Sequence, residues 1–298
     1  MHLFPTLRNY KKENLGKDIL AGLIIMAVSI PISMGYAQIA GLPAVYGLYG
    51  SVLPILFFAV FSTSPQFIFG VDAAPAALVG SALLSMGIES GSEEAMRAVP
   101  VLTLFVALWL FAFSYMKAGK LVNYISAPVM GGFITGICTT IILMQIPKLF
   151  GGSAGVGEFF ELAVHIGESL KKLNLPSLLL GLFALFILLL SKKLIPKFPM
   201  AVLLMAAGAC MTKFLPLKKW GVVTLSAVDP GLMPFTLPDL SVIPVREAVT
   251  ISLSVAIVIM AETLLAENSF AQKNGYRIND NQEIFAFAMG NLIAALTD

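Results

Sequence analysis

Eight apolar segments, each about long enough to cross a lipid bilayer, constrain this sequence more than any other feature. A transmembrane helix needs about 17–25 predominantly apolar residues. The sequence has such runs near residues 18–40, 43–62, 98–118, 126–147, 174–191, 198–215, 247–268 and 281–297. Hydrophobic residues make up 58% of the chain and charged residues only 12%, against roughly 25% charged in soluble domains. We therefore predict an all-α polytopic membrane protein, and we exclude a cytosolic enzyme and a nucleic-acid-binding protein.

A ninth apolar stretch, residues 73–86, is too short to cross a bilayer alone. Residues 66–71 before it are rich in aromatic and β-branched side chains, which favour an extended backbone. We predict that the two segments together form one broken span, an extended segment followed by a half-helix. Asp72 directly precedes the half-helix and is a favourable N-cap. Whether Asp72 acts only as a cap or also contacts a ligand or ion stays open at this point.

Two acidic residues in the last third of the chain lie within or next to an apolar helix. An ionisable side chain at the centre of a bilayer costs about 2.5–3.5 kcal/mol, so each is a functional candidate. Glu262 has apolar neighbours on both sides, and it is either a protonated carboxyl bonded to a neighbouring helix or a proton- or sodium-coupling site. Coupling is favoured, because broken helices bring backbone N–H groups to the midplane, where transporters bind substrate. We expect Glu267 to be interfacial and hydrated.

The candidate substrate-binding residues come from two segments. Ser33 and Tyr36 follow Pro31 on the first helix, where a proline frees a backbone carbonyl. Asp72, Ala73 and Ala74 begin the half-helix. These five residues are our candidate binding set, with Glu262 as the ion-coupling residue.

The remaining reactive residue types indicate neither a metal site nor an enzyme. Cys138 and Cys210 lie in apolar runs, and we expect both to be packing residues. His2 and His165 are the only histidines and lie far apart in the sequence. No catalytic residues and no cofactor are predicted, apart from H⁺ or Na⁺ as a coupling ion.

The N-terminal segment, residues 1–17, lacks the apolar core of a signal peptide. It carries four cations before the first span, Arg8, Lys11, Lys12 and Lys17. Loops rich in lysine and arginine stay in the cytoplasm. We therefore expect a cytoplasmic N-terminus in a multi-pass protein of the plasma membrane or the bacterial inner membrane.

Five motifs, in order along the chain, resemble those of one transporter family. The first extends from Asp18 to Ser81 and contains MAVSIPISMGYAQIAGLPAVYGLYG and FGVDAAPAALVGS. The others are NYISAPVMGGFITG, KKLIPKFPMA, DPGLMPFTLPDL and AETLLAENSFAQKNGYRINDNQEIFAFAMGN. Over residues 18–298 the sequence thus resembles the SulP anion transporters, the sulfate permeases related to pendrin and prestin.

The resemblance implies two inverted seven-helix repeats, with a core domain that moves against a gate domain. Residues 73–86 match the third segment, which holds the anion together with the tenth. Glu262 matches the acidic position of the eighth segment, which contributes to the cation site in sodium-coupled relatives. We expect the first repeat and the start of the second, in a protein that forms a homodimer when full length and contacts membrane lipid. The implied domains are a cytoplasmic arm (1–17), a first stretch of the core domain with segments 1–4 (18–118), a first stretch of the gate domain with segments 5–7 (119–215), an external loop (216–246) and a truncated second stretch of the core domain with segments 8–9 (247–298).

Three departures from the family pattern bear on function. Ile32 stands where many relatives have an anion-contacting glutamine, and Asp72 stands where relatives commonly have a small or hydroxyl residue. The sequence ends at Asp298, where the family turns toward its tenth segment, so we expect a fragment of a longer protein.

The predicted function is secondary active transport of a small inorganic anion of the sulfate or bicarbonate class. We expect coupling to H⁺ or Na⁺ and elevator-like alternating access. The alternatives are a nucleobase or other neutral-solute permease on the same fold, which would use Asp72 for hydrogen bonds, and a non-transporting membrane scaffold.

Overall fold

The computed structural model describes residues 3–7, 10–120, 127–153, 155, 159–195, 198, 200–224 and 235–297. Its elements are helices, and none of the described residues forms a strand. The chain divides into two compact units. The first contains Met1–Asn14, Ile32–Thr135 and Asp229–Asp298, and the second contains Leu15–Pro31 and Gly136–Val228.

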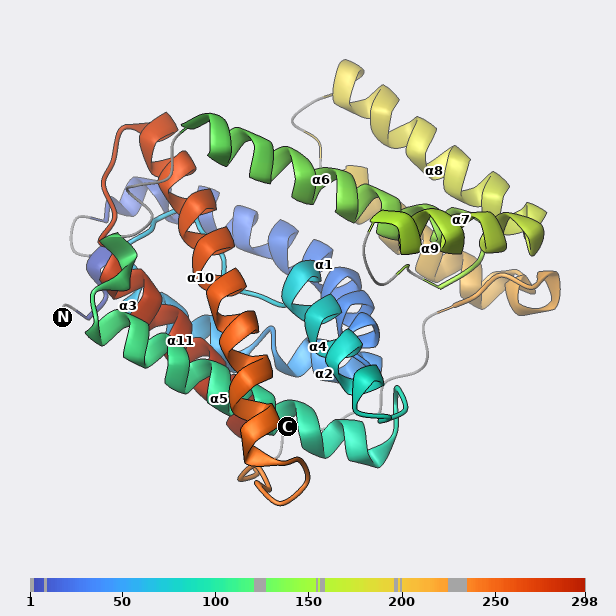
Figure 1. The fold of residues 1–298 in the computed structure, drawn as a ribbon. Helices are drawn as coiled ribbons and strands as arrows, with labels where there is room; N and C mark the ends of the chain where they lie inside the picture. The colour runs from blue at the N-terminus through green and yellow to red at the C-terminus, as the bar shows by residue number, and fades with distance from the viewer. Residues whose placement is uncertain are drawn as a thin grey trace. The chain divides into compact units, whose positions relative to one another are not determined.

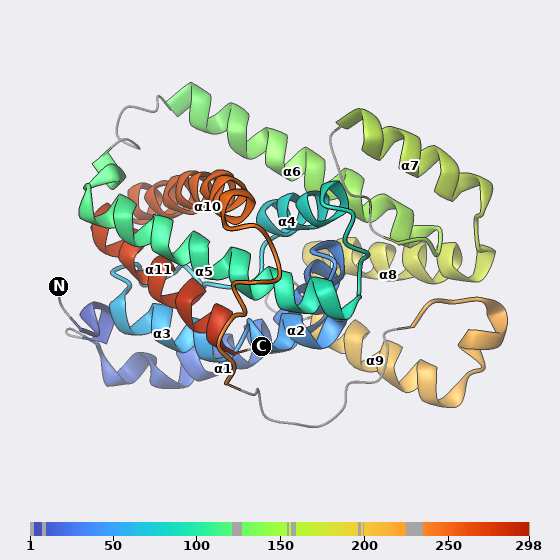
Figure 2. The same ribbon diagram turned by 60° about the horizontal axis from the view of Figure 1, so that its bottom comes forward.

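The first unit is built around four α-helices of very different length. The helix α5 (Glu93–Tyr115) packs against α10 (Val245–Asn274) and α11 (Asp280–Leu296), and α10 also contacts α4 (Ala73–Ser85). Figure 1 and Figure 2 show α5 running beside α11, with α10 next to them. The indole Nε1–H of Trp109 on α5 donates to the carbonyl of Val249 on α10 at 3.1 Å.

An aromatic cluster fills the core between these helices. The ring of Phe287 on α11 is completely buried and stacks on Phe58, with ring centroids 5.2 Å apart. Phe69, from the extended segment before α4, stacks on Phe58 at 5.4 Å. Buried aromatic rings contribute large apolar areas together with specific stacking geometry. The cluster therefore holds the extended segment against α11.

The predicted span 43–62 is two helices rather than one. The helix α1 (Leu15–Ile39) is followed by α2 (Ala44–Tyr49) and α3 (Leu53–Phe61), and residues 50–52 separate the last two. At Gly47 on α2 a Cβ atom would lie 2.0 Å from the carbonyl oxygen of Ser33 on α1, so the two backbones touch. The chain bends after this contact and resumes with Pro54 in the first turn of α3.

The predicted half-helix is confirmed, with both of its ends defined by local chemistry. Residues 67–72 have no helical assignment, and α4 follows directly. At the other end Gly87 has a φ of +75°. The Ile88 N–H bonds the Leu83 carbonyl at 2.9 Å and the Gly87 N–H bonds the Leu84 carbonyl at 3.0 Å. These two bonds form a Schellman motif, which ends helices at a left-handed glycine.

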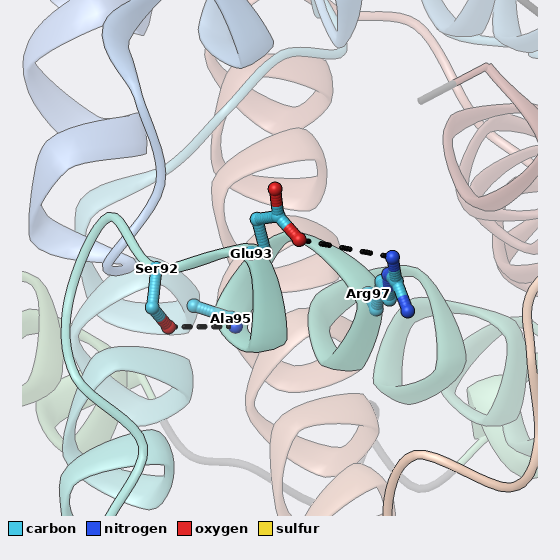
Figure 3. Close-up of polar contacts among 4 residues, drawn as sticks. All are labelled: Ser92, Glu93, Ala95 and Arg97. Atoms are coloured by element: carbon cyan, nitrogen blue, oxygen red, sulfur yellow. Dashed lines mark hydrogen bonds and ion pairs between the residues drawn. The ribbon is translucent and has the colours of Figure 1, made fainter.

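The helix α5 begins with a serine cap. The Ser92 hydroxyl accepts a hydrogen bond from the Ala95 backbone N–H at 3.1 Å, and Glu93 and Arg97 form an ion pair at 3.8 Å one turn apart (Figure 3). An N-cap of this kind satisfies one of the unpaired N–H groups of the first turn. The acidic side chains of this turn also interact favourably with the positive end of the helix.

The second unit contains most of α6 (Ala127–Leu149), and all of α7 (Phe159–Lys171), α8 (Leu175–Leu194) and α9 (Met200–Phe214). The predicted amphipathic helix within 148–173 is α7, which buries Leu162 completely. Asn174 caps α8 by accepting from the Ser177 N–H at 2.8 Å. The expectation that Cys138 and Cys210 pack inside the protein is wrong, because both side chains are exposed on apolar helices.

Five helical segments among the described residues are long and apolar enough to cross a membrane: Lys12–Ile39, Ala44–Phe61, Glu93–Tyr115, Leu175–Leu194 and Val245–Asn274. Ala73–Ser85, Cys138–Leu149 and Met200–Phe214 are apolar but shorter. Large hydrophobic side chains stay exposed along these helices, for example Phe183 and Phe186 on α8. Exposed apolar side chains in this number are expected where the solvent is lipid.

Candidate functional site

A cavity of about 400 Å³ opens within the first unit, beside the N-terminus of α4. Its walls are mostly apolar and include Phe67, Phe69 and Val71 from the extended segment. Polar side chains reach it from several elements, among them Asp72, Thr103, Thr263 and Asn291. A largely apolar pocket with a few convergent polar groups is the usual form of a small-molecule site.

The N-terminus of α4 offers few free hydrogen-bond donors to this cavity. The Asp72 carboxylate accepts from the Ala73 N–H at 2.6 Å, which confirms the predicted cap. The Ala76 N–H bonds the Asp72 carbonyl at 3.1 Å, and Pro75 has no N–H. Among the described residues nothing accepts from the Ala74 N–H. One backbone donor in this turn is therefore free for a ligand.

Three ionisable side chains from separate elements meet next to this helix end. The Asp72 and Glu262 carboxyls interact with each other, and both interact with the Tyr36 hydroxyl from α1. Glu262 lies on α10 and is partly buried, and its buried Oε2 has no hydrogen-bond partner among the described residues. Two ionised carboxylates cannot bond to each other because neither has a donor. A bound proton or cation would relieve their repulsion.

The structure places the candidate residues differently with respect to the cavity. Asp72 lines it, whereas Glu262 and Tyr36 are not among the lining residues and interact with Asp72. Ser33 is buried, is not a lining residue, and accepts a hydrogen bond from the Ser51 hydroxyl at 2.6 Å. Ala73 is buried as well, and neither Ala73 nor Ala74 is among the residues that line the cavity.

Five polar lining residues were missed in the sequence, namely Tyr46, Thr103, Thr263, Asn291 and Thr297. The Thr103 hydroxyl donates to the Val99 carbonyl at 2.9 Å, and the Asn291 amide donates to the Phe287 carbonyl at 2.9 Å. The Thr263 hydroxyl likewise donates to the Ile259 carbonyl. These groups bond to their own helices and leave acceptor atoms for other partners. In the sequence these residues could have been recognised as single polar residues within apolar spans. Thr263 also directly follows Glu262, which was already a candidate.

The expectation that Glu267 is hydrated is wrong. Its side chain is 0% exposed, and neither carboxylate oxygen has a hydrogen-bond partner in the described residues. Helix α10 continues to Asn274, so Glu267 lies about two turns before the helix end. Helix α11 folds back along this stretch of α10 and covers Glu267 with Glu283.

Curated proteins similar to this chain include sulfate transporters and prestin. A probable sulfate transporter of Mycobacterium tuberculosis is 28% identical over 290 residues, which cover 97% of this chain and 52% of the relative. The sulfate transporter of Bos taurus is 28% identical over 319 residues, covering 95% and 43%. Prestin of Danio rerio is 25% identical over 314 residues, covering 95% and 42%. The chain thus spans about half the length of the curated relatives it matches.

Solved structures share the fold. The structure of SLC26A9 superposes with a TM-score of 0.80 at 25% identity, covering 98% of this chain and 49% of that chain. The transmembrane domain of the cyanobacterial bicarbonate transporter BicA gives a TM-score of 0.77 at 18% identity, covering 97% and 73%, and supports the fold alone. The helical, multi-pass membrane architecture is thereby confirmed, and the relatives are transporters rather than enzymes. The family described as the sulfate permease family matches residues 15–298, and the chain belongs to it.

Proposed function

We propose that this chain forms the half-helix side of the substrate site in a secondary active transporter of a small inorganic anion, of the sulfate or bicarbonate class. The observation that carries the proposal is the cavity beside the broken span, which is lined by Asp72, Pro75 and Ala76 at the start of α4. The positive end of a helix favours an anion. The relatives named as sulfate transporters support the substrate class.

The acidic pair next to the cavity supports cation coupling. Like unit charges about 4 Å apart repel each other by about 4 kcal/mol at an effective dielectric constant near 20. An anion entering beside ionised Asp72 and Glu262 would meet such repulsion from both side chains. Binding of H⁺ or Na⁺ at this pair removes negative charge and makes anion binding favourable. Cation and anion would then bind together, which is the requirement for symport.

The two compact units support an elevator-like mechanism. Two stretches of the first unit, Ile32–Thr135 and Asp229–Asp298, contain the cavity and all of its lining residues. We assign this unit to the moving core, and Gly136–Val228 to the gate. The N-terminus would lie in the cytoplasm, and the full-length protein would form a homodimer.

Uptake into proteoliposomes tests the substrate class. The protein in its full natural length is reconstituted, and uptake of labelled sulfate is measured with unlabelled sulfate, bicarbonate or uracil as competitors. We expect sulfate or bicarbonate to compete and uracil to have no effect. Because Asp72 can also accept hydrogen bonds from a neutral solute, competition by uracil alone would favour the nucleobase permease instead.

The coupling role is tested with a matched pair of variants on the same helix. Glu262→Gln keeps the shape of the side chain and removes its charge, and it should abolish the dependence of uptake on a H⁺ or Na⁺ gradient. Glu247→Gln changes an exposed residue of α10 and should leave that dependence unchanged. Unchanged cation dependence in the Glu262 variant would refute the coupling role.

A further inference from the structure

A second pair of acidic side chains is completely buried where α10 and α11 meet. Glu267 on α10 and Glu283 on α11 are each 0% exposed, and their carboxyls interact with each other. Neither residue lines the cavity of the proposed substrate site. The pair is therefore a separate feature of the first unit, five residues along α10 from Glu262.

Glu283 is held by three hydrogen-bond donors. Its Oε2 accepts from the Ser62 hydroxyl at 2.8 Å, and its Oε1 accepts from both the backbone N–H and the hydroxyl of Thr63. Three donors from the segment after α3 thus converge on one side chain. Hydrogen bonds donated to a carboxylate stabilise its charged form.

Glu267 has the opposite environment. In the part of the chain that the structure describes, neither of its oxygens has a hydrogen-bond partner, and no lysine or arginine forms an ion pair with it. The titratable groups that face it are Glu283 and Asp280, both on α11. Asp280 accepts from the amide of Asn268, the next residue along α10, at 2.9 Å, so this amide is already engaged. A buried unpaired charge is very costly and normally takes up a proton instead.

We propose that Glu267 and Glu283 form a proton-binding site in which Glu267 carries a proton that it shares with the Glu283 carboxylate. This arrangement supplies the donor that two facing carboxyls otherwise lack. It also completes a chain of hydrogen bonds from α10 through Glu283 to Ser62 and Thr63. The proton therefore ties the ends of α10 and α11 to the segment after α3.

The occupant is a proton rather than a metal ion. Among the described residues no group of three or more acidic, histidine or cysteine side chains has the geometry of a metal site. Glu283 already uses its oxygens to accept from Ser62 and Thr63. Both side chains are sealed from solvent, so the site excludes a hydrated cation.

A proton that binds only to the folded state determines whether folding stability rises or falls with pH. In the unfolded chain water surrounds Glu267 and Glu283, whereas the folded chain would hold the shared proton between the two buried carboxyls. The folded state then binds one more proton than the unfolded state, and stability falls as pH rises. The unfolding equilibrium constant should increase about tenfold per pH unit over this range for one such proton.

Proton binding at this pair does not depend on transport, and its test needs no substrate. Infrared spectroscopy of the purified full chain near neutral pH detects the carbonyl stretch of protonated carboxyls. We expect Glu267→Gln to lose one such band and the exposed-site control Glu247→Gln to keep it. Because the proposed coupling would also place a proton on Asp72 or Glu262, the measurement is repeated in the D72N/E262Q double variant. A protonated-carboxyl band that persists in the double variant supports a proton on Glu267. If the double variant has no such band, the proposal is overturned, even if E267Q fails to fold.

Thermal unfolding in detergent at several pH values gives an independent readout. The wild type should lose stability relative to E267Q as pH rises, because the amide cannot release a proton. Equal pH dependence of the two proteins would contradict the proposal. Stabilisation of the wild type by Na⁺ at constant pH, absent in E267Q, would identify a metal cation as the occupant and would also overturn it.

Discussion

Substitution of Gly80 tests whether the half-helix must sit directly against α1. Gly80 is buried on α4, and a Cβ atom there would lie 2.2 Å from the Ile39 carbonyl oxygen. Ordinary contact requires the two backbones to separate by about 1 Å, and overpacking of this kind costs about 1–3 kcal/mol. If this cost lowers the free energy of anion binding by the full amount, the affinity for the anion drops by about 5- to 150-fold.

The matched control for Gly80→Ala is Gly22→Ala, both made in the full-length protein. Gly22 is also helical, but a Cβ atom placed on it would have nothing within 4 Å, so a methyl group fits there. We expect the Gly80 variant to show weaker anion uptake and a lower unfolding temperature, with the Gly22 variant close to wild type. Wild-type uptake and stability in both variants would refute the close packing of α4 on α1.

Three other contacts give predictions of their own. Asp72→Ala should lower the unfolding free energy by about 0.5–2 kcal/mol through loss of the helix cap, whereas Asp72→Asn should keep most of it, as measured by thermal unfolding. Phe287→Ala should cost about 3–5 kcal/mol because its buried ring stacks on Phe58, and a cost below about 1 kcal/mol would contradict the aromatic core. Hydrogen bonds from the Ser241 hydroxyl and N–H lower the pKa of Asp239, so that stabilisation is present at neutral pH and lost as pH falls. Ser241→Ala should raise this pKa in a carbon-13 NMR titration, and an unchanged value would refute the contact.

The features predicted from sequence are those that local chemistry determines. The length of residues 73–86 and the cap at Asp72 required only neighbouring residues, and both are confirmed. The amphipathic helix α7 follows from a short periodic pattern in the same way. Most helix ends lie within a few residues of the predicted positions, because apolar length sets them.

The features that were missed depend on residues far apart in the chain. Glu267 is completely buried beside Glu283 of α11, which itself accepts hydrogen bonds from Ser62 and Thr63 more than 200 residues away, and no local pattern indicates this. The close approach of Gly47 to the Ser33 carbonyl, just before the second span is interrupted, also joins two separate helices. The same contact region holds Ser33 in a bond with Ser51, away from the cavity lining.

Cysteine protection tests directly whether the anion binds in the cavity at the start of α4, because a bound anion shields a cysteine in the cavity from a thiol reagent. Cys138 and Cys210 are exposed and are first replaced by serine. Ala76 lines the cavity and Leu84 is an exposed residue of the same helix outside it, so A76C and L84C form a matched pair. We predict that a transported anion slows modification of A76C by a charged thiol reagent and leaves L84C unaffected. Equal rates at A76C with and without anion, in a protein that still transports, would contradict the account.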